Sequence, residues 1–161
     1  DGLTIALDLA AGKLTIGSIA VGSTQHLSAE LFKTKAGIDA LIVPYKGTPA
    51  VLTALRAGEI DVAFEIVGPM LPQVNAKAVR ALAVTSGTRY AGLPEVPAVS
   101  EGGIKGYAVA SWNALAAPAG TPPAVIDRLN RAAADAVAQP AVRQRLQELG
   151  VRAQSGSSRR R

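Results

Sequence analysis

Residues 17–27, GSIAVGSTQHL, and residues 43–49, VPYKGTP, decide how this chain folds. In each stretch an apolar strand runs through a loop of small residues into the start of a helix. Neither helix has an acidic residue in its first turn, because the next acids along the chain are Glu30 and Glu59. A helix start carries unpaired N–H groups and about half a positive charge. Two acid-free starts therefore predict that the chain captures an anion, a carboxylate above all.

Strands and helices alternate between residues 14 and 84. The spacing of apolar residues predicts strands over residues 14–19, 40–43, 60–66 and 79–84, and helices over residues 23–35, 48–57 and 68–76. This alternation is typical of βαβ units and predicts an α/β fold with a mainly parallel sheet. Ligands bind such sheets beyond the carboxyl ends of the strands, where the two helix starts and Glu65 are expected to lie.

The rest of the chain shows weaker patterns. Further strands are expected over residues 3–9, 107–116 and 151–153, and a short helix over residues 98–102. A longer helix is predicted behind a cap at Thr121, and Pro140 interrupts it before a last helix that Gly150 ends. Residues 155–161 (SGSSRRR) contain no apolar residue and are predicted to form a flexible basic tail.

Composition and charge exclude several classes of function. The net charge of the 161 residues is +5 at pH 7, and Arg159, Arg160 and Arg161 supply three of the positive charges. The other Lys and Arg residues are scattered, which argues against nucleic-acid binding. The chain has no Cys and one His, so neither a disulfide nor a transition-metal site is expected. No apolar run is long enough for a transmembrane helix, and no signal peptide is visible after Asp1.

An enzyme is not expected either. A Ser–His–acid set can be drawn from Ser23, His26 and Glu30, but all three lie on one short stretch of one helix. The Gly-x-Ser-x-Gly elbow that exposes a nucleophilic serine is absent. The glycine motifs that bind nucleotide phosphates and dinucleotides are absent as well, and no cofactor is expected.

A series of short motifs, in fixed order and spacing, resembles one family of transport proteins. The motifs are GKLT (12–15), GSTQHL (22–27), VPYKG (43–47), GEID (58–61), VRALAVTS (79–86), LPEVP (93–97), SW (111–112) and APAGTP (117–122). Together they resemble the receptors of tripartite tricarboxylate transporters, also called the Bug family. The resemblance extends from about residue 12 to residue 153 and is specific as a set, although each motif alone is weak.

The resemblance implies a type II periplasmic binding protein, in which two α/β lobes close on a small carboxylate. It implies a periplasmic solute receptor that works with a membrane permease. Because family members are much longer, it also implies a first lobe that is truncated here. Residues 13–86 are expected to form the complete lobe, the family's second, residues 1–12 and 87–154 an incomplete first lobe, and residues 155–161 the tail.

Eight residues are candidates for binding the ligand. Lys46 is expected to add a positive charge, and Glu65 to orient an amine or hydroxyl of the ligand. The other six are expected to donate N–H or hydroxyl groups to a carboxylate: Ser18, Gly22, Ser23, Thr24, Gly47 and Thr48. Each has a plainer interpretation, since Ser and Thr commonly cap helices, a loop lysine is commonly solvated, and an acid at a strand end is commonly a surface residue.

Two functional hypotheses remain open. The first is the carboxylate receptor of a transporter. The second is a truncated fragment that binds no ligand, has no transport role and associates with itself, because missing strands leave an exposed sheet edge.

Overall fold

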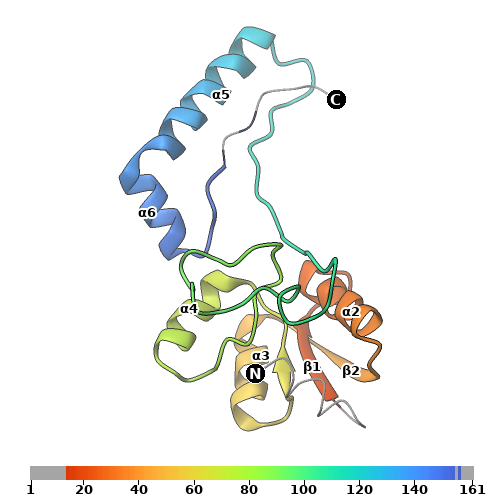
Figure 1. The fold of residues 1–161 in the computed structure, drawn as a ribbon. Coiled ribbons are helices and arrows are strands. Elements are labelled where there is room, and N and C mark those ends of the chain that lie inside the picture. The colour runs from red at the N-terminus through yellow and green to blue at the C-terminus, as the bar shows by residue number, and fades with distance from the viewer. Residues whose placement is uncertain (1–13, 155, 157–161) are drawn as a thin grey trace. The chain divides into compact units, whose positions relative to one another are not determined.

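The computed structural model describes residues 14–154 and 156 (Figure 1). Two compact units divide the chain after Ser111. The strand expected over residues 3–9 and all of the predicted tail except Gly156 lie outside the described residues. The predicted division into a complete lobe up to residue 86 and a partial lobe beyond it stays a prediction. The boundary between the two units of the structure lies later in the chain, after Ser111.

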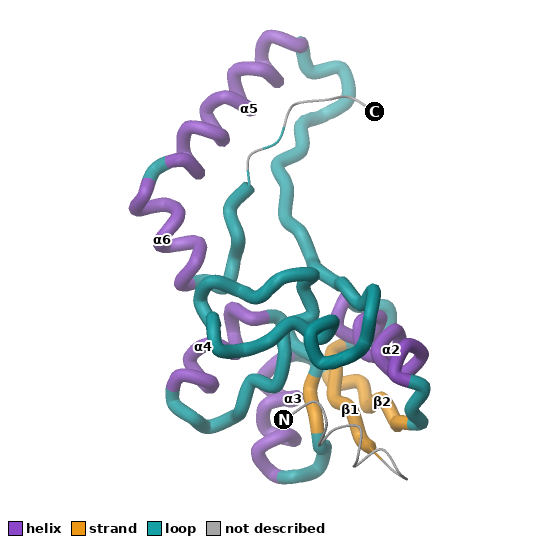
Figure 2. Tube along the Cα trace, viewed as in Figure 1, coloured by secondary structure: helices purple, strands orange, loops and turns teal. Residues whose placement is uncertain are grey.

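The first unit contains a three-stranded parallel sheet (Figure 2). The central strand β1 (Leu14–Ile19) pairs with β2 (Ala40–Tyr45) on one side and with β3 (Val62–Ala63) on the other. Helix α2 (Thr24–Ala36) connects β1 to β2, α3 (Thr48–Ala57) connects β2 to β3, and α4 (Val67–Asn75) follows β3. The predicted α/β class with a parallel sheet is confirmed.

Glycines set the ends of the first two helices and the packing of the central strand. Gly37 and Gly58 end α2 and α3 in the left-handed conformation, with φ of 68° and 73°, as their positions after each helix predicted. A Cβ atom at Gly17 would overlap the side chain of buried Ile60. Any larger residue at this position would force the Ile60 side chain to move, so glycine allows the closest packing of Ile60 on the central strand.

Several predicted strands are wrong or shorter than expected. The strand expected over 60–66 is reduced to Val62–Ala63, and residues 79–84 contribute only one bridge, between Val84 and Ala98. Residues 98–102 form turns rather than a helix, and residues 107–116 and 151–153 are irregular. The sequence supplies strand-like patterns here, but a strand needs a continuous ladder of backbone hydrogen bonds with a neighbour. Among the described residues these segments make only isolated ones, such as the bond from Val109 N–H to the Thr85 carbonyl.

An acid at the start of β3 holds that short strand to β1. Asp61 Oδ2 accepts hydrogen bonds from the Thr15 hydroxyl at 2.6 Å and the Thr15 N–H at 2.8 Å. These bonds lower the pKa of Asp61 below its ordinary value. Because the pKa is lowered in the folded state, the contact stabilises the fold above the ordinary pKa and is lost as the pH falls.

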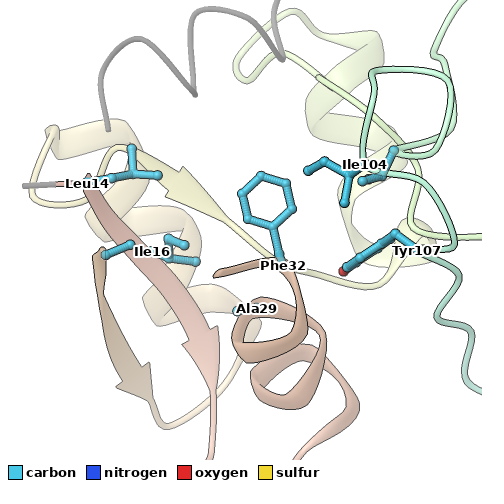
Figure 3. Close-up of a cluster of buried hydrophobic side chains, with 8 residues drawn as sticks. Leu14, Ile16, Ala29, Phe32, Ile104 and Tyr107 are labelled. Atoms are coloured by element: carbon cyan, nitrogen blue, oxygen red, sulfur yellow. The ribbon is translucent and has the colours of Figure 1, made fainter. Parts of the chain in front are cut away.

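The main core of the first unit joins β1, α2 and residues 99–107 (Figure 3). Leu14 and Ile16 of β1 meet Phe32 of α2, and the Phe32 ring lies edge-on to the Tyr107 ring, with centroids 6.2 Å apart. Tyr107 is buried, its hydroxyl donates to the Ser28 carbonyl at 2.9 Å, and its oxygen lies 2.6 Å from Ser28 Oγ. Burial raises the pKa of Tyr107, which keeps this donor protonated.

The second unit contains helices α5 (Pro123–Ala138) and α6 (Pro140–Glu148). Prolines begin both helices and Gln139 is extended between them, as the sequence predicted. The predicted cap at Thr121 is wrong, because the cap position falls on Pro122 and the Thr121 hydroxyl donates to the Pro118 carbonyl. Neither helix contains a buried residue, and Leu129 of the apolar stripe is 54% exposed.

In the described part of the chain, no helix is both long enough and apolar enough to cross a lipid bilayer.

Replacing Tyr107 with Phe tests whether residues 104–107 belong to the first unit. The change removes one hydroxyl and leaves buried Ser28 without its partner, so the free energy of unfolding should fall by about 1–3 kcal/mol. Urea denaturation measures this. Tyr45→Phe is the matched control, because the Tyr45 hydroxyl has no hydrogen bond to a described residue. Equal free energies of unfolding for the two variants would contradict the packing of Tyr107 against Ser28.

Candidate functional site

The predicted site residues all lie in the first unit, at the carboxyl edge of its sheet. Ser18 is near the end of β1, Gly22, Ser23 and Thr24 lead into α2, Lys46, Gly47 and Thr48 lead into α3, and Glu65 follows β3. Because β1 is parallel to both β2 and β3, the three strands end at the same edge, as Figure 1 shows. The structure therefore brings the site segments to one edge, and it brings Glu65 and Thr48 into direct contact.

The start of α2 is capped by a side chain and leaves N–H groups unpaired. Ser23 is the cap residue, and its Oγ accepts a hydrogen bond from His26 N–H at 3.1 Å. Gly22 turns the chain ahead of it, with φ of 83°. No described residue accepts a hydrogen bond from the N–H groups of Thr24 and Gln25. Ser23 thus acts as the ordinary cap, while two N–H groups beside it stay available.

The start of α3 is arranged differently. Gly47, not Thr48, is the cap residue, and it makes no side-chain cap. Thr48 is the first helical residue, and its hydroxyl donates to Glu65 Oε2 at 3.1 Å. A carboxylate from the end of β3 therefore lies beside the first turn of α3. The prediction that this helix start is open to an external anion does not account for Glu65, which lies 17 residues away in sequence.

Two buried polar atoms near this edge have no hydrogen-bond partner among the described residues. They are Glu65 Oε1 and His26 Nδ1. Glu65 Oε2, by contrast, accepts bonds from Thr48 and from the Ile66 N–H. A buried polar atom without a partner costs about 1–3 kcal/mol, so each of these two atoms would be stabilised by a water molecule or by a polar group of a ligand.

Lys46 and Ser18 differ in accessibility. Lys46 is exposed, and no described carboxylate forms an ion pair with it. Its charge therefore faces solvent at the edge where the helices begin. Ser18 is fully buried, and its hydroxyl donates to the Ile19 carbonyl at 3.1 Å. It does not present its hydroxyl at the surface of the first unit.

The lack of acids in the first turn does not by itself mark a site. Helices α4, α5 and α6 also have no acidic residue in their first turns. Unpartnered N–H groups do not mark it either, because the first turns of α4 and α6 also contain N–H groups without a described acceptor. The start of α2 is distinguished instead by its place directly after the central strand, at the carboxyl edge of the sheet.

The first unit also contains an apolar cavity of about 190 Å³. It is bordered by β1, β3, α4 and residues 79–85, and Glu65 is the one predicted site residue that lines it. Sequence reasoning did not foresee this cavity. No group of His, Cys, Asp and Glu side chains within the described part of the chain is arranged to hold a metal ion.

Comparisons with known proteins identify the family of the chain. The family model described as the tripartite tricarboxylate transporter family receptor matches residues 3–160. A UPF0065 protein of Pseudomonas sp. strain P51 is 38% identical over 147 residues, which cover 91% of this chain and 44% of that protein. The resemblance seen in the motifs is confirmed.

Solved structures extend the comparison to the fold. An R. palustris protein solved with adipate superimposes with a TM-score of 0.83 at 34% identity, covering 96% of this chain and 53% of that one. MatC from Rhodopseudomonas palustris with bound malate has a TM-score of 0.67 at 28% identity, covering 92% and 50%. The predicted type of periplasmic binding fold is confirmed, and the chain spans about half the length of these proteins.

A double-mutant cycle tests the contact between Thr48 and Glu65. Thr48→Val and Glu65→Gln each disturb the same hydrogen bond, so their effects on the free energy of unfolding should be non-additive by about 0.5–1.5 kcal/mol. Urea denaturation of the two single variants and the double variant measures this coupling.

The matched control replaces Thr53 on the same helix, whose hydroxyl donates to the Pro49 carbonyl. Thr53→Val and Glu65→Gln should be additive. Additivity in both cycles would show that Glu65 does not lie at the start of α3.

Proposed function

The chain belongs to the tripartite tricarboxylate transporter receptor family, and we propose that it binds a small carboxylate at the start of α2. The observation that carries this proposal is the pair of unpartnered N–H groups of Thr24 and Gln25. Together with the partial positive charge of the helix start, they offer two hydrogen bonds to one carboxylate. Gly22 lets the backbone of this loop come close to the ligand, since it has no side chain.

A dicarboxylate is the class of ligand that the charges favour. Two similar proteins were solved with adipate and with malate, which each carry two carboxyl groups. In this chain one carboxylate would bind the start of α2, while the exposed ammonium group of Lys46 attracts the other. Thr48 and Gly47 border the same edge and would contact the ligand between its two ends.

Glu65 sets a further requirement on the ligand. Its Oε1 is buried and without a partner, and its negative charge would repel a carboxylate placed against it. A donor group on the ligand, such as a hydroxyl or an amine, would satisfy this oxygen. We therefore assign Glu65 the role of orienting a donor group, and the α2 start the role of holding the carboxylate.

We infer the biological role from the family, whose members are described as receptors of a transporter. The protein would present its ligand to a membrane permease from the periplasmic side, as a receptor rather than an enzyme. We assign residues 13–86 to the family's second lobe and residues 1–12 and 87–154 to part of the first. Closure of two lobes about a hinge would trap the ligand in the complete receptor.

The second hypothesis, a self-associating domain without a ligand, rests on the second unit. Helices α5 and α6 bury no residue, and Val125 and Leu129 of the apolar stripe are 44% and 54% exposed. Calorimetry with a panel of carboxylic acids, alongside the mass in solution, separates the hypotheses. A receptor gives a heat of binding with an acid whether the protein is a monomer or an oligomer in solution. The self-associating domain gives a dimer or larger species and no heat of binding.

Replacing Thr24 with Asp tests the proposed site. An acid in the first turn of α2 stabilises the helix but repels an incoming carboxylate. We expect the wild-type chain to bind adipate or malate with a Kd between high micromolar and millimolar, since one lobe contributes only about −4 to −5 kcal/mol. The variant should lose at least tenfold in affinity without losing thermal stability.

Ala124→Asp is the matched control, because it adds the same charge to the exposed first turn of α5. Its affinity should equal that of the wild type. If Thr24→Asp binds as tightly as Ala124→Asp, the ligand does not bind at the start of α2.

A further inference from the structure

The buried face of α2 is partly polar. Its buried residues lie three or four positions apart and so share one side of the helix: Gln25, Ser28, Ala29 and Phe32. The other helices in the described part of the chain bury apolar residues or none. A helix that packs on a sheet normally turns an apolar stripe toward it, so the two polar residues of α2 need a specific explanation.

One of these two polar residues has a partner, and the other has none among the described residues. Ser28 Oγ lies 2.6 Å from the hydroxyl oxygen of Tyr107, and both residues are buried. Gln25 is only 9% exposed, yet its carboxamide forms no hydrogen bond with a described residue. A buried amide without a partner destabilises the folded state, because it has lost its hydrogen bonds to water. Packing within the first unit therefore explains Ser28 but does not explain Gln25.

The carboxamide of Gln25 lies near the helix start. Side chains of an α-helix lean toward its N-terminus, and Gln25 is the second residue of α2. Its side chain therefore extends toward the carboxyl edge of the sheet. Neither polar atom of Gln25 is completely enclosed, in contrast to His26 Nδ1 and Glu65 Oε1. A molecule bound at the start of α2 could thus reach the carboxamide without a rearrangement of the first unit.

The strand beneath α2 changes from apolar to polar at the same edge. Leu14 and Ile16 of β1 belong to the core that α2 covers. Ser18 follows two positions later and so faces the same side of the sheet. Ser18 is fully buried, and its hydroxyl donates to the Ile19 carbonyl and not to Gln25. On both the strand and the helix, the apolar packing ends in a polar residue at the carboxyl edge.

On the basis of the proposed carboxylate site, we propose that the side chain of Gln25 binds the ligand. Its Nε2 donates to the same carboxylate that the N–H groups of Thr24 and Gln25 hold. A carboxylate has two oxygens with about four lone-pair positions, so it accepts a side-chain hydrogen bond in addition to two from the backbone. A bond to an ionised acceptor is stronger than one between neutral groups. The ligand would thus supply the partner that the carboxamide lacks.

Replacing Gln25 with Met separates a binding role from a structural one. Met has a similar length and helix propensity, but it has no amide. We expect the affinity for adipate, measured by NMR titration, to fall about tenfold or more, because one hydrogen bond to a charged group is lost. The melting temperature should stay equal or rise, because the variant no longer buries an unpaired amide. A residue that only packs would give this stability change with no loss of affinity.

Gln73→Met is the matched control. Gln73 lies on α4 in the same unit, and its carboxamide also forms no hydrogen bond with a described residue. This variant should bind adipate as the wild type does. An affinity of Gln25→Met equal to that of Gln73→Met would overturn the proposal and would assign a water molecule to the carboxamide of Gln25.

The side-chain amide signals of the wild-type chain give a second measurement that needs no variant. The Nε2 protons of Gln25 should move downfield as adipate is added, with the same Kd as the backbone amides of Thr24 and Gln25. The Nε2 protons of Gln73 should stay in place. Unchanged Nε2 signals of Gln25 at saturation would overturn the proposal.

Comparison with Thr24→Asp distinguishes this proposal from the carboxylate site on which it rests. If Thr24→Asp weakens binding and Gln25→Met does not, the site stands and the role of Gln25 is wrong. If neither change weakens binding, the site itself is wrong. Weaker binding in both variants, with the melting temperature of each maintained, supports both proposals.

Discussion

Parallel pairing of β1 with both of its neighbours is the constraint on which the first unit depends. In this register Ile16 lies opposite Ile42 on one side and Val62 on the other. The pairing brings the ends of three strands to one edge, and with them the segments that lead into α2 and α3 and the acid that follows β3. A slip of one residue would turn buried Leu14 and Ile16 away from Phe32 and would displace every candidate site residue.

The two helix starts at this edge of the sheet are not equivalent, and the difference would favour one orientation of a ligand over the other. At α2, Ser23 caps the helix and two N–H groups remain without a described acceptor. At α3, Glu65 already places a carboxylate against Thr48. In the proposed site an anionic group would therefore be drawn to the first start and repelled from the second, while a donor group on the ligand would be drawn to Glu65. One acid would in this way distinguish the two ends of a bound molecule.

Features that depend on neighbours in sequence could be predicted, and features that depend on distant residues could not. Gly37, Gly58 and Pro140 set helix boundaries through local backbone geometry, and each boundary was predicted to within a residue or two. The contact between Thr48 and Glu65 and the packing of Tyr107 on Ser28, 79 residues away, required the fold. Residues 79–84 show the same limit, because an apolar pattern indicates a strand but does not supply its partner.

Backbone amide NMR during a titration with adipate tests the central claim most directly. If the start of α2 holds the carboxylate, the amide protons of Thr24 and Gln25 should show the largest shifts and move downfield as they form charge-assisted hydrogen bonds. The amides at the start of α5, which also lacks an acid in its first turn, should not move. Equal shifts at both helix starts, or shifts confined to residues away from Thr24 and Gln25, would contradict the account.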